Sequence, residues 1–577
     1  MSLDKITRSL LDQFVQREQL EGLKEDDAFE RFVNYCVISN EYSDTFDVEE
    51  VSSSDTEYGI DGIAVIVNGT LITDVSEVAG AAEQNKYLDA TFVFAQAKRS
   101  DGFSASAVTS MGHAIQEFFS DSPTVPDTDF IRRYREIADE IYSNSPRFKN
   151  RRPICRIFYA TTGRWTEDPV VSAAMRDVER RLRESDQFET VEFVALGAKE
   201  LQSLYYRTQN PVAVEFTFPR KQPLPSIAGV ESAYIGVLAA ADFLKLIVDE
   251  AGQLQRSLFV DNVRDYQGDN PVNQKIGETL SSGERERFAI LNNGVAIVAR
   301  ELRTSGEKVY MKDYQVVNGG QTSHVVFLHR AELKEGVFIP IKLIGATDED
   351  LTTAVITATN SQTAIRTDEL NARSEFERSV EQYFNAVRGD SQRLFYERRS
   401  KQYNDDASVV GVRIITRAIL VRSYASMFLD EPHRAVGYVP QLLTQMGSQL
   451  FRDSDRLAPY YASAFAYYKL ESLFRNRQVD SSYKPARWHI LMVARHLAVG
   501  RDVAPANSKT VEKQADGMTQ VLWDDAKALE LFKEAVSVVE RALPSLARDA
   551  MRSLQATTDV LTELHGTSAT ASQGESQ

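Results

Sequence analysis

Hydrophobic positions in the first 209 residues alternate between helical spacing and short continuous runs. Spacings of three and four residues predict helices at residues 3–20, 26–39, 105–119, 127–143, 169–184 and 198–207. Short apolar runs predict strands at residues 60–67, 70–75, 91–98, 154–160 and 191–196, with an Asn68-Gly69 hairpin turn between the first two. Strands that alternate with helices predict an α/β sheet covered on both faces.

The rest of the chain shows two other patterns. Residues 210–434 mix expected strands at 288–291, 295–299, 314–317 and 338–344 with expected helices at 321–330 and 348–360. Residues 435–564 are almost wholly helical in pattern, and the Ser/Thr/Gly/Gln-rich residues 565–577 are expected to be a disordered tail. We therefore predict a multidomain α/β protein with an N-terminal α/β/α domain at 1–209, a central mixed α/β domain at 210–434 and a C-terminal α-helical domain at 435–564.

Composition excludes several classes of protein. Cys36 and Cys155 are the only cysteines, too few for a disulfide framework or a multi-cysteine zinc site. The N-terminus lacks the apolar core of a signal peptide, and no apolar stretch is long enough to span a bilayer. We therefore expect a soluble cytoplasmic protein with no membrane partner.

The chain has 577 residues and a net charge of -17, from 66 Lys+Arg and 83 Asp+Glu. This total argues against a uniformly basic protein that coats nucleic acid. The charge is unevenly distributed, because residues 1–60 hold 15 acids and 5 bases, whereas residues 131–156 hold eight bases and three acids. The basic run is either a solvated helix face or a local basic surface.

Asp61, Gln96 and Lys98 are the first candidates for chemistry. Asp61 lies at the start of one expected strand, and Gln96 and Lys98 lie at the end of another. Phosphodiester hydrolysis requires a carboxylate that holds Mg²⁺, a second oxygen ligand and a cation near the scissile phosphate. Asp61, the Gln96 side-chain oxygen with the Ala97 carbonyl, and Lys98 match these needs, and Glu30 adds a carboxylate from the preceding helix. The simpler interpretation is an unrelated surface Asp and Lys.

These residues resemble the site of the PD-(D/E)xK nuclease superfamily, in particular the Mrr-type restriction endonucleases, which carry Gln in place of Glu; the segment FAQAKRS is similar to their signature. The resemblance covers about residues 25–200, and Ile60 stands in place of the proline of the superfamily name. It implies a restriction-endonuclease-like α/β/α domain, Mg²⁺ or Mn²⁺ as cofactor, and often a homodimer.

A second group of motifs is rich in Asn, Gln and Gly. Its segments are NPVN at 270–273, LNNGV at 291–295, VVNGGQTS at 316–323 and TNSQT at 359–363. The candidate nucleic-acid- or nucleotide-binding residues in them are Asn292, Asn293, Asn318, Gly319, Gly320, Gln321, Thr322, Asn360 and Gln362. Backbone N–H groups at a helix start attract anions, and amide side chains suit base or ribose edges. The simpler interpretation is a set of turns and helix caps.

In this order the motifs resemble the abortive infection phage resistance (AIPR) family over about residues 255–405. The resemblance implies bacterial antiphage defence, often with a nuclease-like N-terminal domain, and makes residues 210–434 a central AIPR domain.

Residues 393–403 interleave cations with aromatic side chains, a composition suited to phosphate contact and base stacking. Arg398, Arg399 and Lys401 are therefore candidate nucleic-acid-binding residues, and an amphipathic helix end is the alternative. We predict a metal-dependent endonuclease of phage defence that cleaves DNA in preference to RNA. The alternative is a catalytically inactive sensor that binds nucleic acid or a nucleotide. Either function predicts nucleic acid, a phage-derived trigger and further copies of the chain as partners.

Overall fold

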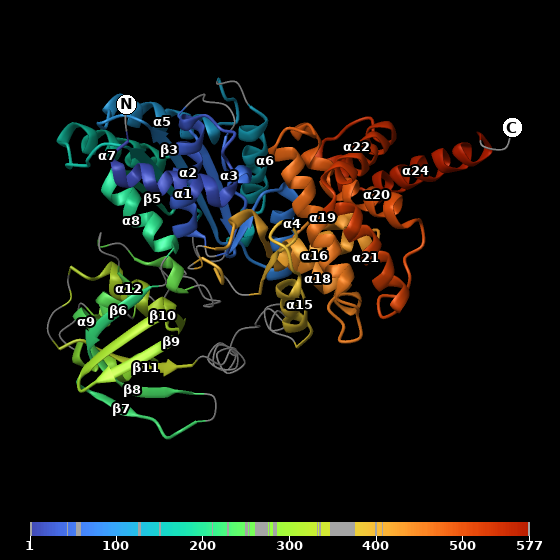
Figure 1. The fold of residues 1–577 in the computed structure, drawn as a ribbon. Helices are drawn as coiled ribbons and strands as arrows, with labels where there is room; N and C mark the ends of the chain where they lie inside the picture. Colours follow the sequence, from blue (N-terminus) through green and yellow to red (C-terminus); the bar gives the residue numbers. More distant parts are fainter. Residues whose placement is uncertain are drawn as a thin grey trace.

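The computed structural model describes residues 3–42, 44–53, 59–124, 128–148, 152–209, 212–227, 230–248, 252, 254–259, 275, 277–280, 285–331, 333, 336–346, 375–398, 401–404, 406 and 408–574. Three parts follow one another along the chain (Figure 1). They are the N-terminal part (residues 3–209), the central sheet (residues 213–345) and the helical part (residues 375–574).

The N-terminal part contains a five-stranded mixed sheet in the order β2-β1-β3-β4-β5. Its strands are β1 (Gly62–Val67), β2 (Thr70–Ile72), β3 (Ala90–Lys98), β4 (Ile154–Thr161) and β5 (Thr190–Leu196). β1 runs antiparallel to both β2 and β3, whereas β3, β4 and β5 are parallel. This arrangement places the start of β1 beside the end of β3.

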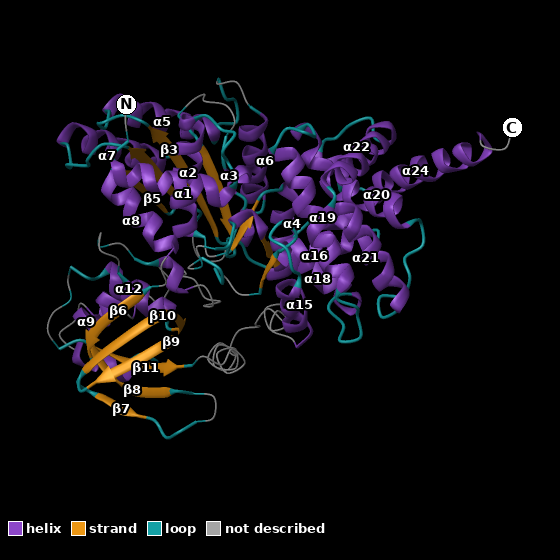
Figure 2. Cartoon of the chain, in the orientation of Figure 1, coloured by secondary structure: helices purple, strands orange, loops and turns teal. Residues whose placement is uncertain are grey.

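Helices cover both faces of this sheet, as the alternation predicts. On one face lie α1 (Lys5–Glu18), α2 (Glu25–Glu41) and α8 (Ala198–Gln209). On the other lie α4 (Val75–Asn85), α5 (Ala105–Phe118), α6 (Asp129–Ser143) and α7 (Pro169–Glu184). Neighbouring residues of β1 enter opposite cores, because Ile63 packs with the second group and Ala64 with the first. Figure 2 shows the strands of this sheet behind α1 and α2.

The predicted strand at 70–75 is too long, and α4 was not predicted from the sequence. The Asn68-Gly69 turn has positive φ at both residues (51° and 77°), as a two-residue hairpin requires. β2 then ends at Ile72, because Asp74 and Glu77 form a capping box that starts α4.

The central sheet has six strands in the order β6-β10-β9-β11-β8-β7. The strands are β6 (Ala213–Thr217), β7 (Lys221–Pro223), β8 (Ser232–Ala239), β9 (Val295–Ser305), β10 (Lys308–Asn318) and β11 (Phe338–Gly345). With them lie α9 (Ala240–Ile247), α12 (Gly320–Leu328), η2 (Arg256–Phe259) and η3 (Arg285–Arg287). The predicted strand at 288–291 is wrong: these residues form α11 (Phe288–Leu291). The helix expected at 348–360 lies outside the described residues.

The helical part packs around one hydrophobic core that runs from Phe376 to Leu564. Its larger helices are α15 (Glu375–Ala386), α16 (Arg417–Phe428), α18 (Val439–Met446), α19 (Ala458–Arg475), α20 (Arg487–Val499), α21 (Lys509–Trp523), α22 (Asp525–Ala542) and α24 (Leu554–Gly574). The short elements are β12 (Phe395–Glu397), η4 (Gly411–Arg413), β13 (Ile414–Thr416), α17 (Pro432–Ala435), η5 (Gly447–Gln449), η6 (Ser481–Ala486) and α23 (Arg548–Met551). None of the helices among the described residues is both long and apolar enough to cross a membrane.

The core and the last helix of this part extend beyond the residue ranges expected from the sequence. Its core begins at Phe376, upstream of the expected boundary at residue 435, because α15 and β12 pack with the C-terminal helices. The expected disordered tail at 565–577 is instead helical as far as Gly574, where α24 ends. α24 projects from the helical part in Figure 1.

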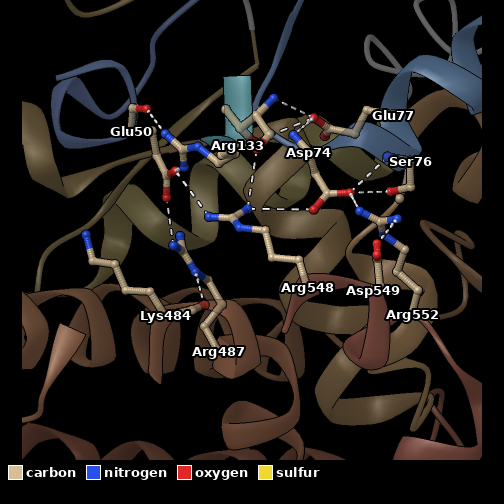
Figure 3. A network of polar contacts seen from close by, with 12 residues as sticks. Glu50, Asp74, Ser76, Glu77, Arg133, Lys484, Arg487, Arg548, Asp549 and Arg552 are labelled. Atoms are coloured by element: carbon tan, nitrogen blue, oxygen red, sulfur yellow. Dashed lines mark hydrogen bonds and ion pairs between the residues drawn. The ribbon is translucent and has the colours of Figure 1, made fainter. Parts of the chain in front are cut away.

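Carboxylates of the N-terminal part pair with arginines of the helical part (Figure 3). Asp74 and Glu77 are buried and Glu50 is half-buried, and the arginines are Arg422, Arg487, Arg548 and Arg552. These three carboxylates join the two parts, and Glu50 is the one that belongs to the acidic residues 1–60.

Residues 395–398 and 401–404 form a second contact between these parts. The Thr45 hydroxyl donates to Glu397 Oε1 (2.9 Å), and Lys401 Nζ donates to the Ser39 carbonyl (2.7 Å). Asn404 Nδ2 donates to the Thr208 carbonyl (2.9 Å). Lys401 is therefore engaged in an internal contact.

Arg422→Met is expected to lower the free energy of unfolding by about 3–5 kcal/mol, because it leaves the buried Glu77 carboxylate without its cation. Urea denaturation of the full chain measures this. Arg434→Met is the matched control, since Arg434 pairs with Glu431 at a 43% exposed position; its cost should stay below about 1 kcal/mol. Equal costs for the two variants would contradict a structural role for the interface.

Glu397→Gln is expected to gain stability over the wild type as pH rises. Burial raises the pKa of Glu397 from 4.5 to about 8, against the hydrogen bond from Thr45. Between these two values the unfolded chain loses the proton that the folded chain retains, so the wild type loses stability while the variant does not. From about pH 5 to pH 8 the gap should widen by at least about 1.4 kcal/mol, the equivalent of one pKa unit.

Denaturation at several pH values checks this, with Glu184→Gln as a control at a 61% exposed carboxylate. A gap that does not change with pH would show that Glu397 is ionised in the folded chain.

Candidate functional site

The structure brings Asp61, Gln96 and Lys98 together at one end of the N-terminal sheet. Gly62 is paired with Ala95, so Asp61 stands beside the last residues of β3. The Asp61 N–H donates to the Ala95 carbonyl (2.9 Å), and the Asp61 carboxylate accepts from the Ala97 N–H (2.7 Å). Residues from opposite ends of two strands are thus adjacent in the sheet.

Asp61 is held by α2 and by the segment that precedes β1. Asn34 Nδ2 donates to the Asp61 carbonyl and to Ser52 Oγ (both 2.9 Å), and the Ser53 N–H donates to the Asp61 carbonyl (3.0 Å). A Cβ on Gly62 would lie 2.3 Å from Asn34 Oδ1, so glycine is required for this close approach. The sequence analysis missed Asn34, although it is four residues after Glu30 and therefore on the same face of α2.

Gln96 carries a buried oxygen without a partner. The residue is 3% exposed, and no group among the described residues hydrogen-bonds its Oε1. Buried polar atoms are nearly always hydrogen-bonded, so an orphaned oxygen on the residue next to the Ala97 N–H that binds Asp61 indicates a position for a water or a cation.

Glu30 and Asp61 form an acidic pair. Burial and the neighbouring Asp61 carboxylate raise the pKa of Glu30 to about 7, while Arg31 and Lys98 oppose the shift. Burial also raises the pKa of Asp61, against the Ala97 N–H, Lys98 and Arg31. Desolvated carboxylates of like charge are stabilised by a bound cation. The donor set thus fits one divalent ion held by carboxylate, amide and carbonyl oxygens.

Lys98 completes the arrangement, because its side chain is exposed and yet close enough to influence both carboxylates. The next residue, Arg99, is occupied by ion pairs with Glu25 (3.2 Å) and Asp26 (2.5 Å). Across the described residues, no three His, Cys, Asp or Glu side chains converge in a metal-binding cluster. A cation here would thus depend on Gln96 and the Ala97 carbonyl as well as on carboxylates.

The AIPR-type motifs of the central sheet meet one another. Asn292 Nδ2 donates to Thr322 Oγ1 (3.0 Å), and Asn292 Oδ1 accepts from the Gly294 N–H (2.8 Å). Gly319 has φ 94°, and a Cβ there would lie 2.7 Å from Val295 Cγ2. These contacts agree with the simpler interpretation of turns and helix caps, and they join the loop at 292–294 to the loop at 319–322.

Nucleic-acid or nucleotide binding by this region stays a prediction. Asn293 is exposed, and Asn318 and Gln321 are half-buried beside the start of α12. The Gly320 carbonyl lies 2.9 Å from His324 Nδ1, so it is already engaged within the helix. Asn360, Gln362 and Arg399 lie outside the described residues.

Nucleic-acid binding by Arg398 and Lys401 stays a prediction, and both side chains have partners within the protein. Arg398 is buried and pairs with Glu381 (3.0 Å), and Lys401 is directed into the contact with α2. In the basic run at 131–156, Arg133 pairs with Glu50. Arg132, Arg152 and Arg156 also pair with carboxylates.

Comparison with known proteins identifies the C-terminal half of the chain. The family model "AIPR protein" matches residues 259–549, just over half of the chain. No curated protein and no solved structure matches it. The family match does not extend to the site at Asp61, whose nuclease resemblance is not confirmed by any comparison. The chain belongs to the AIPR family, and this membership supports a role in abortive infection defence against phage.

Proposed function

We propose that the protein is a divalent-metal-dependent endonuclease of abortive infection, with its active site at Asp61, Gln96, Lys98 and Glu30. The observation that carries the proposal is the orphaned Gln96 Oε1, which is buried on the residue next to Ala97, whose N–H binds the Asp61 carboxylate. The resemblance of Asp61 and Gln96-Ala97-Lys98 to the PD-(D/E)xK pattern supports it.

Each side chain has a separate task. Asp61 and Gln96 Oε1, with the Ala97 carbonyl, are the ligands for Mg²⁺ or Mn²⁺, which supplies Lewis acidity when bound. Lys98 Nζ neutralises charge that develops on the phosphate oxygens. The carboxylate of Glu30, whose pKa of about 7 lies near the operating pH, accepts a proton from the attacking water.

Phosphate binding at this site is limited to Lys98 and a bound metal ion, because the surrounding surface is acidic. Acidic residues line the start of α2, and Arg99 is already paired with two of them. A nucleic acid therefore approaches Lys98 against negative charge, so binding depends on the metal ion and weakens with salt. DNA is the expected substrate, and RNA is included in the test.

Asp61→Asn and Lys98→Met are each expected to reduce cleavage by at least about 10²–10³-fold, because each removes charge stabilisation at the reacting phosphate. The assay incubates the full chain with plasmid DNA, linear DNA and RNA in Mg²⁺ or Mn²⁺. Asp129→Asn, at a 98% exposed position on α6, is the control for loss of a carboxylate and should cleave as the wild type does. Wild-type cleavage that survives in both site variants would contradict the proposal.

Gln96→Glu is expected to bind Mn²⁺ at least about tenfold more tightly than the wild type, because a carboxylate replaces a neutral amide ligand. Calorimetric titration with Mn²⁺ measures this, and cleavage is measured at the same metal concentrations. Asp61→Asn in the Gln96→Glu background should remove the gain. Unchanged affinity in Gln96→Glu would place Gln96 outside the metal site.

The same pair of measurements separates the proposal from the alternative, a catalytically inactive sensor. The neutral amide at Gln96 favours that alternative, since it binds Mg²⁺ more weakly than a carboxylate does. Cleavage by Gln96→Glu together with none by the wild type would identify the N-terminal part as a degraded nuclease.

A further inference from the structure

Glu50 is held from two parts of the chain. It lies on α3 (Val48–Val51), where its carboxylate pairs with Arg133 of its own part (2.7 Å) and with Arg487 of the helical part (2.7 Å). Arg548 approaches the same carboxylate at 4.0 Å (Figure 3). Burial opposes ionisation, yet the surrounding arginines and Lys484 lower the pKa of Glu50 well below its ordinary value.

Arg487 is itself fixed within the helical part. Its Nη1 pairs with Glu471 (3.1 Å), and its Nε donates to the Lys484 carbonyl (3.0 Å). A guanidinium held at three of its nitrogens has little rotational freedom, so it fixes the position of Glu50 rather than following it.

α3 leads directly to the groups that hold Asp61. Ser52 is bridged to Gly62, and its hydroxyl accepts the second hydrogen bond of Asn34. The Ser53 N–H donates to the Asp61 carbonyl (3.0 Å). Glu50 is therefore two residues before Ser52 and three before Ser53, the two residues whose backbones contact Gly62 and Asp61.

α3 is also tied to the helix that carries Glu30. Arg31 Nε pairs with Glu49 Oε1 (3.0 Å), and Arg31 Nη1 lies 3.9 Å from Glu30. A displacement of α3 therefore affects both carboxylates of the site.

We propose that the helical part positions the Asp61 site through Arg487 and Glu50, so that movement of the helical part loosens the site. This inference rests on the proposed function for its catalytic consequence, whereas the coupling of Arg487 to Asp61 is a property of the fold. Arg487 and Glu50 are positioning residues, because neither one reaches the metal ligands. Arg487 lies in the region that the AIPR family model matches. The Arg487–Glu50 contact therefore links that region to the candidate site.

The same interface supplies a matched control. Arg552 pairs with Asp74 across the two parts (2.5 Å), as Arg487 pairs with Glu50. Asp74, however, caps α4, which packs on the opposite face of the sheet from α2 and α3. Arg548 lies near both Asp74 (3.7 Å) and Glu50 (4.0 Å), but the Arg552 contact itself joins the two parts at α4 and not at α3.

The test compares Arg487→Lys and Glu50→Gln with Arg552→Lys in the full chain. A lysine keeps the charge but cannot hold Glu50, Glu471 and the Lys484 carbonyl together. Two readouts are used: amide hydrogen exchange of peptides covering residues 48–53 and 59–67, and the affinity for Mn²⁺ alone. Glu50→Gln keeps the Arg487–Glu471 pair and so separates loss of the contact from disturbance of the helical core.

We expect faster exchange in both peptides for Arg487→Lys and Glu50→Gln, and wild-type exchange for Arg552→Lys. Mn²⁺ affinity should fall by about tenfold in the first two variants, as for residues that support a metal ligand, and by less than about twofold in the control. Exchange and affinity that match the control would overturn the inference and leave the nuclease proposal intact. A wild type that binds no Mn²⁺ would overturn the nuclease proposal, while the exchange data would still decide the coupling.

Discussion

The buried contact of Glu50 with Arg133, Arg487 and Arg548 is the constraint on which the organisation of the molecule depends. A carboxylate and three guanidinium groups are costly to remove from water unless they neutralise one another with good geometry. Arg133 neutralises Glu50 from its own part, and Glu471 neutralises Arg487 within the helical part. The pairing of Glu50 with Arg487 and Arg548 joins these two networks, so the N-terminal and helical parts are complementary in charge where they meet.

Three of the carboxylates that contribute to the negative net charge take part in this interface. Glu50, Asp74 and Glu77 add to the negative total yet are shielded by arginines of the helical part. A net charge of -17 therefore says little about any one surface of the protein. What remains exposed near the candidate site is Lys98 beside a carboxylate pair, a local arrangement of charge that a cation balances.

The sequence predicted those features that depend on residues close together along the chain, such as strands and helices. The apolar run at 91–98 predicted β3, and the positions of Asp61, Gln96 and Lys98 at strand ends marked them as candidates, which the pairing of β1 with β3 brings together. It was uninformative where the decisive partner is distant. The sequence around Arg398 and Lys401 is typical of phosphate-binding segments. In the structure, however, Arg398 pairs with Glu381 and Lys401 donates to the Ser39 carbonyl. Asn34 was missed for the same reason, since its role depends on Ser52 and Asp61 together.

The family match and the candidate chemistry lie in different regions, residues 259–549 and residues 30–98, and the arginine contacts join them. The proposed function requires a divalent ion bound by Asp61 and Gln96. Crystals grown with Mn²⁺ and measured at the manganese absorption edge test this most directly. The proposed metal site predicts an anomalous peak within ligand distance of the Asp61 carboxylate and Gln96 Oε1. Fully occupied Mn²⁺ elsewhere, with no peak at these two oxygens, would contradict it.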